Sequence, residues 1–258
     1  MSGINTNIAS TTAQRWLAGT QSSLQTSMAR LSSGLRVNTA KDDAAGMAIA
    51  SKLEATKRGT DVGIRNANDA ISMAAMADGA LASITANIQR MRELAVQKAS
   101  GTISGDTDAL AAINAEMDLL GAEVTRVIGN TKFNGVDLIA ANTTSVELGD
   151  GSTAVAFATT AFTATLSKAS DTAALDTALN AANLTRAQYG ATQNQFESIV
   201  GNLRSNSESL SAARGRIMDA DYAQETANLS RAQVLQQAGT AMVAQANQGP
   251  QGVLALLR

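Results

Sequence analysis

The chain has 258 residues, a formal net charge of −2, no His, no Cys and only 3% aromatic residues. The lack of imidazoles and thiols excludes His and Cys nucleophiles, Cys/His zinc sites and disulfides. The near-neutral charge gives no basic footprint for nucleic acid, and the Ala-rich apolar composition suits narrow helix-helix seams better than a thick globular core.

The amino-terminal segment is predicted to be an almost uncharged helix. Residues 1–29 contain one charged residue, Arg15, and Leu17, Leu24 and Leu31 follow at intervals of seven. That spacing is typical of a coiled-coil helix. The segment has neither a basic start nor an unbroken apolar run, so we do not expect it to be a secretory signal peptide.

A second and longer helix is predicted over residues 44–99. Its apolar positions are again spaced by seven: Ala67, Ala74, Leu81, Ile88 and Ala95. At 1.5 Å per residue this helix would measure ~80 Å, which exceeds the width of a compact domain of this size. The molecule is therefore expected to be a rod.

A third helix follows a break rich in Ser and Gly, with Thr107 or Asp108 as the predicted N-cap. Its apolar residues alternate steps of three and four: Leu110, Ile113, Met117, Leu120, Val124 and Val127. The Asn134-Gly135 pair after this helix predicts a tight turn.

The middle of the chain, at about residues 140–170, changes to a period of two. The alternating apolar residues form three runs, with Asp150-Gly151 between the first two: Val146 and Leu148; Val155 and Phe157; Phe162, Ala164 and Leu166. This pattern predicts a β-hairpin or a three-strand element. The helical pattern resumes at Ala173 or Ala187, and Leu203, Leu210 and Ile217 continue a heptad.

The carboxyl-terminal segment is uncharged from residue 232 to residue 257, but it contains seven Gln and Asn side chains. Seven amides are too many for a transmembrane span. Uncharged first and last helices are expected to be buried against protein, so we predict that they pair with each other. Such a helix pair would be only marginally stable in a single chain. It would become stable where the apolar faces of many copies of the chain pack together.

The sequence thus predicts a mainly α protein: an elongated rod of long coiled-coil helices, with the N- and C-termini paired at one end and a small β-hairpin in the middle of the chain. Residues 1–43 with 217–258 form one discontinuous domain, and residues 44–216 form the other. This organisation indicates a self-assembling structural protein.

Four segments resemble bacterial flagellin. They are LSSGLRVNTAKDDAAGMAIASKL (31–53), NDAISMAAMADGALASITANIQRMRELAVQKASGT (68–102), TKFNGVDLI (131–139) and the carboxyl terminus from residue 211. The resemblance covers about residues 1–140 and 185–258. Only about 45 residues lie between Asn142 and Ala187, so the resemblance implies a short flagellin without the outer variable domains.

The resemblance implies a structural subunit that polymerises into the flagellar filament, the propeller for swimming. Residues 1–43 and 217–258 would be its inner-tube domain, and residues 44–216 its outer-tube domain. The residues expected to pack in the inner tube are Leu17, Leu24, Leu31, Val234, Leu235, Met242, Val253, Leu254, Leu256 and Leu257.

The resemblance also implies partners and a location. The chain would be secreted to the extracellular flagellum by the flagellar export apparatus, with help from the flagellin chaperone. It would meet the filament cap and the hook-filament junction proteins. A junction protein is itself the alternative reading of the chain, although the matches at 68–102 and 131–139 favour flagellin.

Catalysis and metal binding have little support. The carboxylate clusters Asp42-Asp43, Asp106/Asp108 and Asp219/Asp221 lack the register of a calcium-binding EF-hand loop. We expect them to be helix caps, contacts of the connecting segments or solvated groups. A helical enzyme or ligand carrier would have no phosphate loop or convergent polar cluster to use, so no enzyme activity and no cofactor are expected.

Residues 89–97, QRMRELAVQ, have two readings. One is a continuation of the helix seam through Met91, Leu94 and Ala95. The other, implied by the resemblance, is a patch recognised by the animal Toll-like receptor for flagellin, made of Arg90, Leu94 and Glu116. In this second reading all three side chains are expected to project from the helices.

Overall fold

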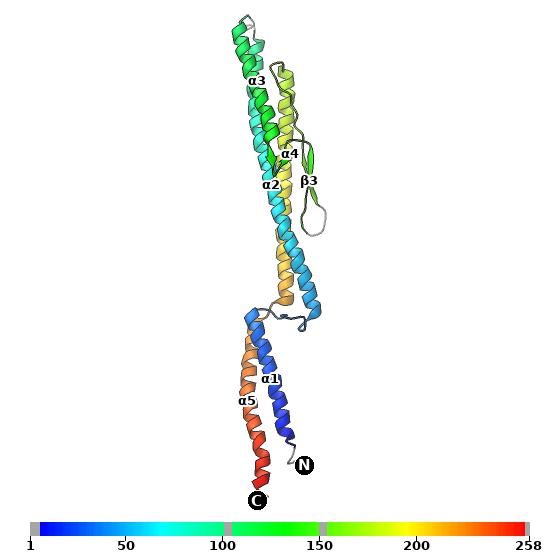
Figure 1. Ribbon diagram of the computed structural model, residues 1–258, viewed down its shortest axis with the longest axis vertical. Helices are drawn as coiled ribbons and strands as arrows, with labels where there is room; N and C mark the ends of the chain where they lie inside the picture. Colours follow the sequence, from blue (N-terminus) through cyan, green and yellow to red (C-terminus); the bar gives the residue numbers. More distant parts are fainter. Residues whose placement is uncertain (1–5, 101–104, 150–153, 256–258) are drawn as a thin grey trace. The chain divides into compact units, whose positions relative to one another are not determined.

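The computed structural model describes residues 6–100, 105–149 and 154–255, and side chains up to residue 248. Within these residues the helices are α1 (Ile8–Ser33), α2 (Ala44–Ala99), α3 (Thr107–Asn130), α4 (Thr172–Met218) and α5 (Tyr222–Ala255). The strands are β1 (Lys132–Phe133), β2 (Val136–Asp137), β3 (Asn142–Val146) and β4 (Val155–Thr159) (Figure 1). The protein is mainly α, with small hairpins in the middle of the chain, as predicted.

The chain forms two compact units. Unit 1 comprises Met1–Ala55 and Leu210–Arg258, and unit 2 comprises Thr56–Ser209. The continuous helices α2 and α4 each contribute residues to both units.

Helix α2 has 56 residues, which correspond to about 84 Å. It has the bounds that the sequence predicts. Its start is fixed by Asp43, whose carboxylate accepts a hydrogen bond of 2.8 Å from the backbone N–H of Gly46. This bond satisfies one of the N–H groups that the first turn of a helix leaves free.

The core of unit 2 is built on one face of α2. The heptad residues Ala67, Ala74, Leu81, Ile88 and Ala95 are all at most 6% exposed, which confirms the predicted seam. Side chains from α3, α4 and the hairpins cover this face, among them Met117, Val124, Tyr189 and Phe196. An 18-residue window of α2 reaches a mean hydropathy of 1.2, so by length and composition this helix could cross a membrane; 39% of the window is buried within the protein.

Helix α3 begins at Thr107, so the residue before it is the N-cap. The cap is Asp106, whose carboxylate accepts hydrogen bonds of 3.1 Å from the backbone N–H groups of Asp108 and Ala109. The prediction of Thr107 or Asp108 was therefore wrong. The charged acceptor of Asp106 faces the positive end of the helix dipole, and Thr107 becomes the first helical residue.

The β region consists of two antiparallel hairpins. Asn134 and Gly135 both have positive φ, 48° and 83°, in the turn between β1 and β2, so the predicted tight turn is confirmed. β3 pairs with β4 from Asn142↔Thr159 to Val146↔Val155. Asp150-Gly151, which separates the first two apolar runs in the sequence, lies outside the described residues.

The third apolar run does not form a strand. Phe162 and Leu166 are 2% and 9% exposed, and the Phe162 N–H donates to the carbonyl of Ile139. Both side chains belong to the core of unit 2. Of the two predicted forms, the hairpin is the one observed, because the residues after β4 are held by core packing rather than by a third ladder.

The β3–β4 hairpin is fixed to unit 2 on two sides. The Phe157 ring lies 6.3 Å from the rings of both Tyr189 and Phe196 on α4. On α2, Asn66 Nδ2 donates to the Glu147 carbonyl at 2.8 Å. The hairpin thus contacts both α4 and α2.

Next to that bond, the hairpin backbone contacts the surface of α2 at two glycines. A Cβ placed on Gly59 would lie 1.9 Å from the carbonyl oxygen of Gly149, and one on Gly63 would lie 2.0 Å from that of Leu148. Gly149 has φ +79°, a conformation that favours glycine. The backbones touch because no side chain stands between them.

Unit 1 contains a small core where the connecting segments meet. Val37, Ala50 and Met218 are each at most 8% exposed. The backbone of Gly34 accepts from Ala220 N–H at 2.9 Å, and Gly34 adopts φ +72° to end α1. The end of α1 and the start of α5 are therefore tied together.

Candidate assembly surface

Helices α1 and α5 form an antiparallel pair within unit 1. Near one end, the Asn7 side chain donates to the Ala246 carbonyl at 2.8 Å; near the other, the Tyr222 hydroxyl donates to the Leu31 carbonyl at 3.2 Å. The first and last helices of the chain pair with each other, as the sequence predicts.

The seam between α1 and α5 is made mostly of small, polar or half-buried side chains. Ser10 and Ser27 of α1 and Ala232 of α5 are each 5% exposed, and Glu225 is 7% exposed. The predicted packing residues of α1 (Leu17, Leu24 and Leu31) are only half-buried. Little apolar area is removed from water in such a seam, so the pair gains little from the hydrophobic effect.

Three large apolar side chains of α5 and one of α1 are mostly exposed. Val234, Leu235 and Met242 are 64%, 51% and 63% exposed, and Trp16 of α1 is 71% exposed. A helix pair whose buried positions are small or polar while its large apolar side chains are exposed is the reverse of the pattern in a surface helix of a globular protein. This face requires a further partner to be buried.

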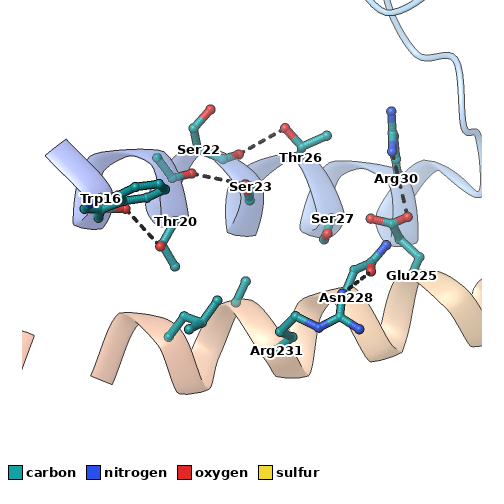
Figure 2. A pocket seen from close by; sticks show the side chains of 13 residues that line it. Trp16, Thr20, Ser22, Ser23, Thr26, Ser27, Arg30, Glu225, Asn228 and Arg231 are labelled. Carbon is teal, nitrogen blue, oxygen red and sulfur yellow. Dashed lines mark hydrogen bonds and ion pairs between the residues drawn. The ribbon is translucent and has the colours of Figure 1, made fainter. Parts of the chain in front are cut away.

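A polar pocket of about 640 Å³ lies along the seam between residues 16 and 30 of α1. In Figure 2, Trp16 and Thr20 lie at one end, and Arg30 and Glu225 lie at the other. The hydroxyls of Thr20, Ser23 and Thr26 donate to carbonyls one turn earlier on α1 (3.0–3.1 Å). These three hydroxyls are satisfied by their own helix. Arg30, which also lines the pocket, differs: its Nε is buried without a hydrogen-bond partner among the described residues, and its Nη1 lies 3.8 Å from a Glu225 carboxylate oxygen.

An apolar groove of about 710 Å³ continues the seam beyond Trp16. It is lined by uncharged residues: Ala9, Thr12, Ala13, Trp16, Leu17, Thr20, Leu235, Ala238, Gly239 and Met242. Leu17, Leu235 and Met242 were predicted to be packing residues, whereas Trp16 was not. Its signal in the sequence was a single Trp within an almost uncharged helix.

The other predicted packing residues lie at the carboxyl end of the chain. Val253 and Leu254 are in α5, but their side chains lie outside the described residues, as do Leu256 and Leu257 altogether.

The three carboxylate clusters contain helix caps and turn contacts. Asp221 accepts from the N–H groups of Ala223 and Gln224 at the start of α5. Asp42 accepts from the backbone and side chain of Thr39, and these hydrogen bonds lower the pKa of the Asp42 carboxyl. In the part of the chain that the structure describes, no group of three or more carboxylates is placed to hold a metal ion.

Comparison with known proteins accounts for almost the whole chain. Residues 4–144 match the family model of the bacterial flagellin N-terminal helical region, and residues 172–257 match that of the C-terminal helical region. The chain belongs to the bacterial flagellin family. Flagellins are structural proteins of the bacterial flagellum, an extracellular organelle, and this chain is a structural subunit of the flagellar filament.

Individual flagellins align with this chain from end to end. It is 39% identical to the flagellin of Halalkalibacterium halodurans over 273 residues and 36% identical to that of Bacillus subtilis over 303 residues. It is also 35% identical over 287 residues to the flagellar filament 33 kDa core protein of Treponema phagedenis. Each alignment covers 99% of both chains.

The length of this flagellin leaves room for little besides the two conserved regions. Only residues 145–171, which include β4, fall between the two matched segments. The chain is therefore a short flagellin without the variable domains, as the resemblance implies.

The candidate receptor patch is only partly at the surface of this flagellin. Arg90 is exposed and paired with Glu116 at 2.9 Å and Glu93 at 3.1 Å; the bond to Glu116 is the main cause that raises the pKa of Arg90. Leu94, in contrast, is 2% exposed in the core of unit 2. The prediction that all three side chains project was wrong for Leu94, because it follows Met91 by one turn on the buried stripe of α2.

Proposed function

We propose that this chain polymerises through α1 and α5, which form the inner tube of the filament, while unit 2 forms the outer tube. The inner-tube domain would comprise residues 1–43 and 217–258, and the outer-tube domain residues 44–216. One observation carries this proposal: the large apolar side chains of α5 are more than half exposed on the α1–α5 pair, whereas the fully buried positions of its seam are small or polar.

The energetics favour assembly over an isolated pair. Burying one Val, Leu or Met side chain that is otherwise exposed gains about 1.5–3 kcal/mol. Val234, Leu235 and Met242 are each more than half exposed, so one subunit leaves most of this gain unused. Contact with neighbouring subunits would recover it, and no charge in residues 232–255 opposes such contact.

Filament growth tests the proposal directly. Purified protein seeded with short filament fragments should grow into long filaments visible by electron microscopy. A hook-filament junction protein would instead stop after adding a limited layer. None of the similarities reported above favours the junction protein.

The same packing predicts that the termini of the monomer are easily cleaved. Because the α1–α5 seam buries little apolar area, residues 1–40 and 218–258 should be largely unfolded in the monomer and helical in the filament. Limited proteolysis of monomer should trim both ends and leave a fragment near 44–216, whereas filaments should resist. Protease-resistant ends in a verified monomer would contradict this expectation.

Secretion through the flagellar export apparatus, with the flagellin chaperone bound to the carboxyl end, is part of the same proposal. A chain without Cys and with a single Pro has no crosslink and little slow isomerisation to delay passage as an unfolded chain. Contacts with the filament cap and the junction proteins would follow at the two ends of the filament. The role is structural, and no catalytic step is assigned to it.

We also propose that Arg90 and Glu116 contribute to recognition by the Toll-like receptor for flagellin. They are exposed on neighbouring helices and joined by a hydrogen bond, so they present a defined polar surface. Leu94 would act indirectly, by fixing α2 in the core beneath Arg90.

The Arg90→Ala variant should bind the receptor about tenfold or more weakly if Arg90 is an interface anchor. Binding by surface plasmon resonance and thermal unfolding should be measured together, because the fold should be unaffected. Leu94→Ala is unsuitable for this test, since emptying a core site costs about 2–5 kcal/mol of stability. Equal binding by wild type and Arg90→Ala would end the receptor proposal.

A further inference from the structure

Methionine is the only sulfur-containing residue of this chain, which has nine Met and no Cys. Three Met side chains are well exposed: Met242 at 63%, Met28 at 54% and Met76 at 46%. The other described ones are partly or fully buried: Met47, Met73, Met91, Met117 and Met218. An oxidant in solution reaches the exposed thioethers first, so Met242, Met28 and Met76 are the candidate oxidation sites.

Met242 differs from the other two in its surroundings. It lines the apolar groove of about 710 Å³ on the α1–α5 pair, together with Leu235 and Ala238 of the same helix. These three residues are separated by steps of three and four, so they lie on one face of α5. Met28 and Met76 do not line this groove. Met242 is thus the exposed Met that lies on the face proposed to be buried by polymerisation.

The groove has little to offer a polar group. Its lining side chains are hydrocarbon or thioether apart from those of Thr12, Thr20 and Trp16. The Thr20 hydroxyl already donates to the Trp16 carbonyl at 3.0 Å. A thioether loses nothing when it leaves water for such a groove. A sulfoxide oxygen loses its hydrogen bonds to water there, and a polar group buried without replacement bonds costs free energy.

We propose that Met242 is an oxidation site that controls assembly, because its conversion to methionine sulfoxide opposes burial of this face of α5. The inference rests on the proposed polymerisation through α1 and α5. Unassembled subunits would be sensitive to oxidant, whereas assembled subunits would shield Met242 from it.

The oxidant is a hydroperoxide, in the simplest case hydrogen peroxide. A lone pair on Sδ of Met242 attacks one peroxide oxygen, so that an S–O bond forms while the O–O bond breaks. The departing hydroxide takes the proton from the new S–OH group and leaves as water. Sulfur is oxidised by two electrons and the peroxide is reduced by two. Methionine sulfoxide reductases reverse the change, one enzyme for each sulfoxide epimer.

Peroxide treatment of purified monomer tests the inference. Peptide mass spectrometry should find sulfoxide at Met242, and the protein concentration needed for seeded filament growth should rise about tenfold or more. Treatment with both reductases and dithiothreitol should restore growth. In intact filaments the same peroxide should oxidise Met242 severalfold more slowly.

Three variants show which sulfur is responsible. Each variant is compared with its own untreated sample, so any effect of the substitution itself cancels. Peroxide should change the growth of Met242→Leu little, because leucine has no sulfur to oxidise. Met28→Leu and Met76→Leu should lose growth on oxidation as the wild type does. Unfolding of unit 2 should be unchanged by the treatment, since Met73, Met91 and Met117 are buried.

The remaining outcomes overturn one proposal or the other. Normal growth of wild-type protein with sulfoxide at Met242, or an equal loss of growth in oxidised Met242→Leu, would overturn the inference. Equal oxidation rates of Met242 in monomer and filament would also overturn it, while filament growth itself would stand. Failure of untreated wild-type protein to form filaments would instead refute the proposed function.

Discussion

Replacing Leu235 and Met242 together with Asp should abolish filament growth. Both side chains are exposed in the subunit and are proposed to be buried between subunits. An unpaired carboxylate placed in such an interface costs several kcal/mol, and each subunit would carry two of them. Seeded growth followed by light scattering and electron microscopy should show no elongation at any concentration that supports wild-type growth.

A matched control shows whether the loss of growth comes from the buried charge or from any change at these two positions. The Leu235→Met and Met242→Leu exchange keeps the apolar character and nearly the volume, so it should still polymerise. Unit 2 contains neither residue, and its unfolding should be the same in all three proteins. Normal filaments from the double Asp variant would show that this face of α5 stays in water.

Replacing Gly59 and Gly63 together with Ala should destabilise unit 2 by about 1–3 kcal/mol, the usual cost of overpacking. Each new Cβ would lie 2.0 Å or less from a backbone carbonyl oxygen of the β3–β4 hairpin. The hairpin must then leave α2, and the bond from Asn66 to Glu147 is lost. Urea unfolding of the full-length monomer, followed by circular dichroism, measures the change.

Gly79 provides the control on the same helix. A Cβ there would meet nothing within 4 Å, so Gly79→Ala should stabilise the protein by about 0.5–1 kcal/mol through helix propensity alone. Gly59→Ala and Gly63→Ala gain the same stability from helix propensity. The steric clash of the new Cβ atoms with the hairpin backbone must therefore cost more than this gain. A double variant as stable as Gly79→Ala would mean that the hairpin does not depend on close contact with α2.

The sequence by itself determined the helical architecture of this protein. The seven-residue spacing from Ala67 to Ala95 identified the buried face of α2, and the two uncharged ends indicated that α1 pairs with α5. Asn134-Gly135 located a turn correctly. These features depend on local periodicity, chain-length geometry and the backbone preferences of single residues, which are all written along the chain.

Only the tertiary structure decided which neighbouring element covers each face of a helix or strand. Arg90 and Leu94 are one turn apart, yet a rotation of about 40° between them places Leu94 in the core of unit 2 and leaves Arg90 half exposed, paired with Glu116 and Glu93. The third apolar run has the period of a strand but is held in the core by Phe162 instead of pairing.

The assembly surface shows the same division. Its residues could be selected from the sequence because charge is missing there, but Trp16 and the groove could not. The groove exists because Gly239 lets Leu17 approach the backbone of α5, a contact between residues more than two hundred positions apart. The periodicity of one helix does not show how large the side chains are on the helix that pairs with it. The size of those side chains determines where a groove opens in the apolar surface.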